Sequence, residues 1–598
     1  MEQIKERLSR LRLYMKTYSI DLCIVPTADY HQSEYVAEHF KYRAYLSGFS
    51  GSAGTLVVTA TQAKLWTDSR YFLQAAQQLE GSGIDLMKIR CEGYPTMLEW
   101  IAAQDIRRIG IDAEVFSVRE VQDLQAAIDG RGILLDTAFK SYDAVWNGRP
   151  ALPDAPAYLL GTEVSGESTL SKLERVRQAM QQAGADYYLL ASLDEIAWCL
   201  NLRGEDIAYN PCALAYAIIG SEDCHLYMQE DKLSDEDVAT LEQFKVYLRP
   251  YGQFAQDIRA LSPEAKVCFD ADKINYLVYE SIPQACLHLP VNSIINRMKA
   301  VKNATELAGI DRAMVKDGIC FVRFWKKMED LLDSGVQPGE YDLAELLAQE
   351  RLQQPACVGE SFDAIVAYGE NAAIVHYTPT AQAQTKVHYG NILLIDHGGQ
   401  YNTDGTTDMT RTIALYRHPE ELPEDYLQDY AAVLKGNIAL AQAVFPQGTR
   451  GCQLDVLARQ FMWKLGCNYG HGTGHGIGHF LNVHEGPQSI RMEENPVELE
   501  ESMIISNEPG IYKTGKYGIR LETMIAVEKA FESDFGRFLR FRTLTVCPWD
   551  LMSIKTEYYT REELDYINDY HAMVYRTLSP YLNDEECRWL QTKTRSIS

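Results

Sequence analysis

Acidic residues and histidines gather in short clusters in the last third of the chain, and these residue types can hold metal ions or move protons. The first cluster follows an apolar run, in LLIDHGGQYNTDGTTDMTRT, and the second is YGHGTGHGIGHFLNVHEGP. The third and fourth are IISNEPGIY and GIRLETMIAV, and IVHYTP lies upstream. The candidate side chains in these stretches are Asp396, Asp404, Asp408, His471, His475, His479, His484, Glu508, Arg520, Glu522 and His376.

Each cluster alone has an ordinary structural interpretation. Asp404 followed by glycine favours a plain turn. Asp396 could end its strand as a solvated carboxylate, and Glu522 could simply pair with Arg520. The glycine run at 470–478 could cradle a phosphate, but it lacks a Gly-Lys-Ser/Thr ending. Its histidines stand four residues apart, yet so many glycines oppose a helix and favour a confined, extended backbone.

Taken together, the clusters indicate a metal centre. Two aspartates, two glutamates and one histidine make an oxygen-rich donor set, which suits Mn²⁺, Mg²⁺, Co²⁺ or Zn²⁺ better than a thiolate site does. One carboxylate can bridge two cations. Two cations roughly 3.5–4 Å apart can share a water and lower its pKa, which gives a hydroxide nucleophile near neutral pH. The predicted chemistry is hydrolysis of an amide or ester.

The order Asp, Asp, His, Glu, Glu resembles the metallopeptidases with the "pita-bread" fold, and in detail the long, three-domain, cytosolic type of aminopeptidase P. The likeness spans nearly the whole chain. It is carried by WTDSRYFLQA (66–75), LRGEDIAYNP (202–211), AIVHYTP (373–379), DGTTDMTRT (404–412), GHGTGHGIGHFLNVHEGP (470–487), SNEPGIY (506–512) and GIRLE (518–522). The resemblance implies a fold of mixed α/β and α+β class, with two tandem creatinase-like α/β domains followed by a pita-bread catalytic domain.

The same resemblance implies a role for each candidate residue. The implied metal ligands are Asp396, Asp408, His475, Glu508 and Glu522, with Asp408 and Glu522 serving both metals. Glu508 is also the implied general base. His376 and His484 would steady the scissile carbonyl and its oxyanion, Arg520 would orient substrate or Glu522, and His471 is a further active-site histidine. Asp404 is not an implied ligand.

Three positions depart from the expected pattern. Asp408 stands twelve positions after Asp396, one more than expected, and the hypothesis is that the extra residue near Asn402 leaves the site intact. Ser502 stands where glycine is usual before the following strand. His479 is an additional histidine, for which a surface or packing role is expected.

The elements that must position these groups can be read from periodicity. Short apolar strands are expected at 392–395, 412–415, 503–505 and 524–527. A single helix is expected from Ala304 to Leu332, capped by Asn303 or Thr305. The tail after about Tyr558 is expected to be helical.

An internal repeat organises the first half of the chain. Residues 11–27 and 176–192 each read as a helix that leads into a strand. At an offset of 165 residues, Arg12, Met15 and Asp21 match Arg177, Met180 and Asp186. The proline-rich stretch 147–156 separates the two copies. We therefore expect α/β domain I at 1–150, a related domain II at 151–298, and the catalytic domain with a helical extension at 299–598.

Composition restricts the classes of function. The chain of 598 residues has 57 Lys+Arg against 83 Asp+Glu, a net charge of −26, which disfavours nucleic acid and anionic membranes as partners. Thirteen scattered cysteines without Cys-x-x-Cys indicate reduced thiols. The charged N-terminus lacks a signal-peptide core, and a cytoplasmic protein is expected.

The expected activity is that of a metallo-aminopeptidase which hydrolyses the N-terminal Xaa-Pro peptide bond through a hydroxide bridging two metals. The family habit favours Mn²⁺, with Zn²⁺ or Co²⁺ as alternatives, and a homodimer. The expected substrates are peptides with proline in second position. The alternatives are a prolidase-like Xaa-Pro dipeptidase and an inactive peptide-binding relative. A creatine-type hydrolase lacks these ligands, and a phosphate-binding module would rest on the glycine run alone.

Overall fold

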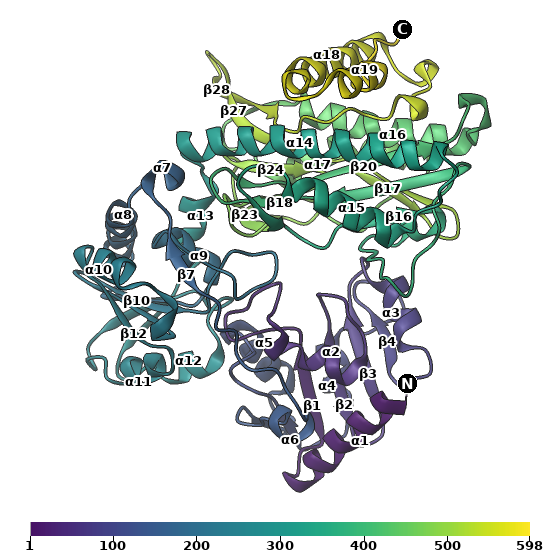
Figure 1. Ribbon diagram of the computed structural model, residues 1–598. Helices are drawn as coiled ribbons and strands as arrows, with labels where there is room; N and C mark the ends of the chain where they lie inside the picture. The colour runs from purple at the N-terminus through teal and green to yellow at the C-terminus, as the bar shows by residue number, and fades with distance from the viewer. Residues whose placement is uncertain (1) are drawn as a thin grey trace. The chain divides into compact units, whose positions relative to one another are not determined.

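The computed structural model describes residues 2–598 and divides into two compact units (Figure 1). The N-terminal unit comprises Met1–Thr162 and Glu167–Asn296, and the C-terminal unit comprises Glu163–Gly166 and Arg297–Ser598. Among the described residues, no helix has the length and apolar character needed to cross a membrane.

The N-terminal unit contains two six-stranded sheets with the same topology. Their strand orders are β4-β3-β2-β1-β5-β6 and β12-β11-β10-β8-β13-β14. In each sheet a central strand pairs antiparallel with the next long strand and parallel with a later one. The strands of the first sheet are β1 Leu22–Pro26, β2 Thr55–Thr59, β3 Ala63–Thr67, β4 Asp85–Lys88, β5 Arg108–Gly110 and β6 Leu134–Asp136. Those of the second are β8 Tyr187–Leu190, β10 Tyr216–Gly220, β11 Cys224–Met228, β12 Val246–Pro250, β13 Lys266–Phe269 and β14 Leu287–Pro290.

The residues of the internal repeat occupy equivalent places in the two sheets. Arg12 donates to the last carbonyl of β2 at 2.9 Å, and Arg177 to the last carbonyl of β10 at 3.0 Å. Asp21 accepts from the first N–H of β5 at 2.9 Å, and Asp186 from the first N–H of β13 at 2.8 Å. The shared residues therefore make the same links between helix, sheet and loop in both copies, which confirms two related α/β folds.

Helices of this unit bury one face each. Helix α1 follows the predicted spacing and buries Ile4, Leu8, Leu11 and Met15. The helices are α1 Glu2–Thr17, α2 Tyr42–Ser47, α3 Phe72–Leu79, α4 Met97–Ala102, α5 Val118–Ile128, α6 Tyr142–Val145, α8 Thr169–Gln182, α9 Leu193–Cys199, α10 Asp235–Gln243, α11 Phe254–Arg259 and α12 Tyr276–Glu280. A small pair, β7 Ala157–Leu159 and β9 Leu202–Gly204, follows the irregular proline-rich stretch.

Two sheets in the C-terminal unit carry or directly flank the five implied metal ligands. The first has the order β16-β17-β20, and the second the order β21-β28-β27-β24-β22-β23. Their strands are β16 Ile365–Tyr368, β17 Asn391–His397, β20 Met409–Leu415, β21 Val444–Pro446, β22 Gly474–Gly476, β23 Glu485–Ile490, β24 Ile504–Asn507, β27 Thr523–Ser533 and β28 Gly536–Thr543. Smaller sheets contain β15 Cys357–Glu360, β18 Gly399–Tyr401 and β19 Gly405–Thr406, and the pair β25 Gly510–Lys513 and β26 Tyr517–Arg520.

Long helices cover these strands (Figure 1). Helix α14 runs from Ala304 to Asp333, and the Asn303 side chain caps it by accepting from two backbone N–H groups, as predicted. The predicted C-terminal helices are present as α18 and α19. The helices that lie within this unit are α14, α15 Glu340–Leu352, α16 Glu424–Ala441, α17 Gly451–Trp463, α18 Arg561–Leu578 and α19 Asp584–Lys593. The chain boundaries between the two units fall in or directly after two short helices, α7 Thr162–Ser165 and α13 Ile294–Ala300.

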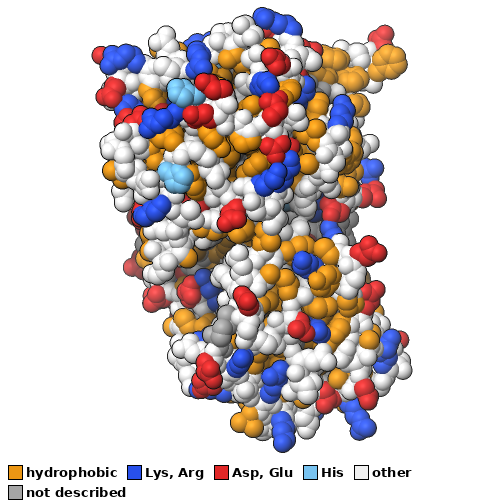
Figure 2. All heavy atoms as spheres, turned by 90° about the vertical axis from the view of Figure 1, so that its right-hand side faces the viewer, with side chains coloured by type: hydrophobic (Ala, Val, Ile, Leu, Met, Phe, Trp, Pro, Cys, Tyr) orange, Lys and Arg blue, Asp and Glu red, His pale blue; other side chains and the backbone are white. Residues whose placement is uncertain are grey.

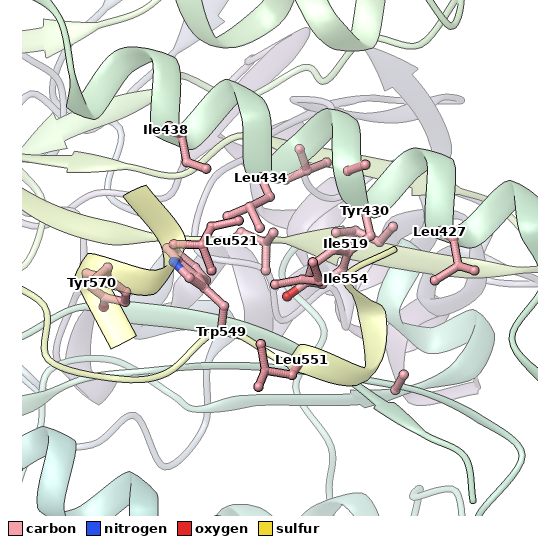
Figure 3. Packing of buried hydrophobic residues seen from close by; sticks show 14 of the residues in the cluster. Leu427, Tyr430, Leu434, Ile438, Ile519, Leu521, Trp549, Leu551, Ile554 and Tyr570 are labelled. Carbon is pink, nitrogen blue, oxygen red and sulfur yellow. The ribbon is translucent and has the colours of Figure 1, made fainter. Parts of the chain in front are cut away.

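A large apolar core holds the C-terminal unit together. Leu427, Tyr430, Leu434 and Ile438 project from one face of α16 toward Leu521 and its neighbours (Figure 3). Burying one such leucine contributes roughly 1.5–3 kcal/mol. On the face shown in Figure 2, acidic and basic side chains are interspersed. The core thus supports the strands from which the polar candidates extend.

Candidate metal centre

Asp396 and Asp408 lie at the same end of one antiparallel pair. Asp396 is the penultimate residue of β17, and Asp408 immediately precedes β20, where Asp396 pairs with Thr410. Between them in the chain lies the turn from β18 to β19, where the Asp404 N–H donates to the Tyr401 carbonyl at 3.0 Å. Asp404 also pairs with Arg312, which links this turn to α14.

His475 lies on β22, and Glu508 immediately follows the neighbouring strand β24 of the second sheet. The ring Nε2 of His475, on β22, lies 3.4 Å from an Asp408 oxygen and 3.5 Å from a Glu508 oxygen. A Cβ at Gly474 would overlap the Ser506 carbonyl oxygen of β24. The glycines around His475 therefore allow close strand pairing, which confirms the predicted confined, extended backbone.

Glu522 completes a compact donor group. It lies between β26 and β27, and Thr410 donates its hydroxyl to Glu522 Oε2 at 2.7 Å. One donor atom each from Asp408, His475 and Glu522 lie within 4.8 Å of one another. The structure thus brings together residues that are 114 positions apart in the chain, as the spacing from Asp408 to Glu522 shows.

Burial and the repulsion between neighbouring carboxylates raise the pKa values of two members of this group. Burial raises the pKa of Asp396 to about 6, since the opposing charge of Arg520 is countered by Asp408 and Glu508. Burial, together with the charges of Asp408, Glu508 and Asp396, raises the pKa of Glu522 well above its ordinary value. Oxygen Oδ1 of Asp396 is buried and has no hydrogen-bond partner among the described residues.

In His475 and Glu508 the neighbouring charges favour the ionised form of the side chain instead. Although burial lowers it, the pKa of the His475 imidazole rises to about 9 because of Asp408 and Glu508. Burial opposes ionisation of Glu508, but His471 and His475 hold its pKa below the ordinary value. Crowded carboxylates, an unpaired buried oxygen and one imidazole form a donor set that fits divalent cations.

A hydrogen-bonded chain runs along the edge of this donor group. Arg520 donates to Asp396 Oδ2 at 2.6 Å and to the Tyr512 hydroxyl at 2.8 Å. That hydroxyl is 2.8 Å from His471 Nε2, and His471 Nδ1 is 3.7 Å from a Glu508 oxygen. Burial lowers the pKa of His471 to about 4, so its ring is neutral near pH 7.

Sequence reasoning missed Tyr512 and Thr410. Both lie within stretches that carry the family resemblance, SNEPGIY and DGTTDMTRT, but no local pattern gives the partners of their hydroxyls. Those partners depend on the pairing of β25 with β26 and of β17 with β20.

The two histidines expected to steady a carbonyl have different surroundings. The His484 ring stands perpendicular to the His475 ring, with centroids 4.5 Å apart. His376 is half-buried and lies shortly after the 3-10 helix η4, Gly369–Ala373. A Cβ at Gly518 of β26 would overlap the Ala372 carbonyl oxygen, so this segment packs on the hairpin that carries Arg520. The ring contact places His484 beside His475, and the packing of residues 372–373 brings the segment that contains His376 against the hairpin of Arg520.

Two further expectations concern residues outside the donor group. His479 is 3% exposed and lies against Gly309 and Gly405, so it has a packing role. Ser502 has a φ of 74°, the left-handed region in which glycine is favoured, which explains why glycine is expected there.

Comparisons with known proteins cover the whole chain. Sequence models of the Creatinase/Prolidase N-terminal domain match residues 7–140 and 148–306. The model of metallopeptidase family M24 matches 308–529, and that of the C-terminal region of peptidase M24 matches 537–597.

Relatives resemble the chain along its full length. A "Probable Xaa-Pro aminopeptidase P" from Neurospora crassa is 39% identical over 98% of this chain and 88% of its own. "Aminopeptidase P2" from Arabidopsis thaliana is 36% identical over 100% of this chain and 89% of its own. A solved X-prolyl aminopeptidase from Caenorhabditis elegans, described as a cytosolic enzyme with a di-nuclear active site, covers 100% of both chains with a TM-score of 0.94 and 32% identity.

A shorter solved protein shares part of the fold. An Xaa-Pro dipeptidase from Bacillus anthracis superposes with a TM-score of 0.51 and 22% identity. It covers 64% of this chain and 99% of its own.

Proposed function

Because the chain belongs to the Xaa-Pro aminopeptidases of metallopeptidase family M24, we propose that it removes the N-terminal residue from peptides whose second residue is proline. The observation that carries this is the convergence of Asp408, His475 and Glu522 within 4.8 Å, beside Asp396 and Glu508. Full-length similarity to aminopeptidases, including the second α/β repeat, favours this activity over a dipeptidase.

The proposed cofactor is a pair of divalent cations held by Asp396, Asp408, His475, Glu508 and Glu522. Mn²⁺ is the proposed metal, and Zn²⁺ or Co²⁺ would suit the same donors. When bound, two such cations lower the pKa of a water and polarise the scissile carbonyl. The buried, unpaired Asp396 Oδ1 and the mutual repulsion of the carboxylates support this assignment.

The protein's own residues would divide the remaining work. Glu508 would accept the proton of the attacking water, since the neighbouring charges of His475 and Arg520 favour its ionised carboxylate. His376 and His484 would donate hydrogen bonds to the carbonyl oxygen as negative charge develops on it. Arg520 would orient Asp396 through the bond at 2.6 Å.

The proposed substrate also contains a particular kind of peptide bond. An Xaa-Pro bond is a tertiary amide without an N–H, so its recognition cannot use a donor at that position. Binding would depend on a fit to the proline ring and on the substrate's free amino group, which the acidic character of the site favours.

Three properties of the whole protein complete the proposal. We propose a homodimer, a cytoplasmic location, and a division at 1–150, 151–298 and 299–598. The cytosolic description of the Caenorhabditis elegans enzyme supports the location. The separate sequence models for residues 7–140, 148–306 and 308–529 support the division.

The test compares an Xaa-Pro-Xaa tripeptide with an Xaa-Pro dipeptide, using metal-free protein and protein with added Mn²⁺. Release of the first residue from the tripeptide should require the metal, and Glu508→Gln should lower kcat by about a thousandfold or more while the fold remains intact. Cleavage of the dipeptide alone would identify a prolidase. Absence of cleavage despite two bound metals would indicate a peptide-binding relative.

A further inference from the structure

A buried ionic network that the proposed reaction does not use lies directly behind the strand that carries Asp396. Its centre is the pair of Asp317 on α14 and Arg351 on α15, whose side chains are 0% and 1% exposed. Arg351 Nε donates to Asp317 Oδ1 at 3.0 Å. Charges this deeply buried are costly to desolvate, so each must be held by several partners.

Asp317 accepts two further hydrogen bonds. The Tyr401 hydroxyl donates to Oδ1 at 3.1 Å, and the Thr407 hydroxyl donates to Oδ2 at 3.1 Å. Thr407 in turn accepts from the Gly399 N–H at 2.8 Å. The Thr407 hydroxyl therefore links the buried carboxylate to the backbone of β18.

Arg351 contacts the other side of the same segment. Its Nη2 donates to His397 Nδ1, and the His397 ring stacks on Phe321 with centroids 4.8 Å apart. Its Nη1 donates to Glu360 at 3.2 Å. The guanidinium thus connects α15, β15 and the last residue of β17.

The network touches the neighbours of two proposed ligands. His397 follows Asp396, and Thr407 precedes Asp408. Because successive side chains of a strand point to opposite faces, His397 lies behind β17 when Asp396 faces the donor group. The network therefore holds both ligand-bearing segments from the side opposite the donors.

Two glycines make this close approach possible. A Cβ at Gly398 would overlap the Thr407 carbonyl oxygen, and one at Gly399 would lie 2.6 Å from Arg351 Cδ. No other residue type fits either position without displacing the network.

On this geometry, and resting on the proposed function, we propose that the Asp317–Arg351 pair is a positioning unit for the metal centre. Through Thr407 and His397 it fixes the separation of Asp396 from Asp408, and so sets how tightly the centre binds its cations. Loss of partners behind metal ligands typically weakens metal binding 10–100-fold.

The decisive comparison is Thr407→Val against Thr407→Ser. Valine has the shape of threonine but cannot donate to Asp317 or accept from Gly399, whereas serine can do both. In isothermal titration with Mn²⁺, Thr407→Val should weaken binding by about tenfold or more, and Thr407→Ser should stay within about twofold of the wild type. Co²⁺ absorption should report altered ligand geometry in the valine variant only.

Asp317→Asn is the second variant, and Glu329→Gln is its matched control. Glu329 lies on the same helix and accepts from Trp325 at 3.1 Å and Trp589 at 2.7 Å, far along the helix from Asp317. Both substitutions should lower the melting temperature, but only Asp317→Asn should weaken cation binding. If Asp317→Asn does not fold, the two Thr407 variants still decide the question.

The proposal is overturned if the folded Thr407→Val variant binds two cations with wild-type affinity and an unchanged Co²⁺ spectrum. It is equally overturned if Glu329→Gln weakens binding as much as Asp317→Asn does. A wild-type protein that fails to bind two cations would instead contradict the proposed function, so the two failures are distinguishable.

Discussion

At the scale of single residues, Tyr512 links two groups that flank the donor set with one hydroxyl. It accepts from Arg520 and lies 2.8 Å from His471 Nε2. Tyr512→Phe removes both contacts without removing a proposed ligand. We expect kcat for a tripeptide to fall about 10–100-fold, with two cations still bound, because Arg520 and His471 lose their fixed positions.

Steady-state kinetics and metal analysis would check this, with Tyr517→Phe as the control. Tyr517 lies on the same hairpin, but its hydroxyl donates to Asp429 at 2.9 Å. The control should retain wild-type kcat. Equal losses in both variants would mean that the hairpin tolerates no loss of a hydroxyl, and that Tyr512 has no special role.

The ligand types could be predicted from the sequence, whereas their supports could not. Asp408 and Glu522 stand in motifs whose residue types suit a metal. The hydroxyl that positions Glu522 comes from Thr410, 112 residues away, and only the register of two sheets brings them together. The roles given to His376 and His484 stay predictions, since neither residue spacing nor side-chain packing specifies which atoms of a substrate these rings contact.

At the scale of elements, local signals predicted local structure well. Asn303 caps α14 as expected, because capping depends on residues three apart. The apolar parts of β17 and β20 were predicted, but both strands extend further, since their ends carry polar residues such as Asp396. The order of strands, with β22 between β24 and β23, depends on contacts between distant segments, and periodicity contains no such information.

Helix α18 carries a pH-dependent contribution to stability through His571. Its Nε2 accepts from the Trp549 N–H at 3.0 Å, and burial, with the charges of Arg411 and Arg595, lowers its pKa to about 3. An unfolded histidine has a pKa near 6.5, so the unfolded chain binds a proton that the folded chain does not. Stability from this group is complete above about pH 6.5 and is lost as the pH falls toward 3, by about 2 kcal/mol at pH 5.

His571→Gln should therefore flatten the dependence of stability on pH. Between pH 7.5 and 5, the free energy of unfolding of the variant should fall by about 2 kcal/mol less than that of the wild type, as measured by urea denaturation at each pH. His418→Gln is the control, because His418 is exposed to water. If the free energy of unfolding of His571→Gln and of the wild type depends on pH in the same way, protonation of His571 does not destabilise the folded protein, and the prediction is wrong.

At the scale of the whole molecule, the proposed metal ligands all belong to one of two compact units. Asp396, Asp408, His475, Glu508 and Glu522 lie in the C-terminal unit, and the two related sheets lie in the N-terminal unit. The repeat was visible in the sequence because Asp21 and Asp186 make the same backbone contacts in both copies. Cation binding should therefore stabilise only the C-terminal unit against unfolding.

Calorimetry of the full chain would test this separation. Free Mn²⁺ at about 100 times its dissociation constant should stabilise the unit that binds it by about 2.7 kcal/mol per site, and chelation should remove that stabilisation. We expect one thermal transition to shift with metal and another to stay in place. Asp21→Ala, which removes the acceptor for the Arg107 and Arg108 N–H groups, should lower only the transition that metal leaves unchanged. If metal and Asp21→Ala shift the same transition, the two units unfold as one, and the cations stabilise the repeat as well as the sheets that bind them.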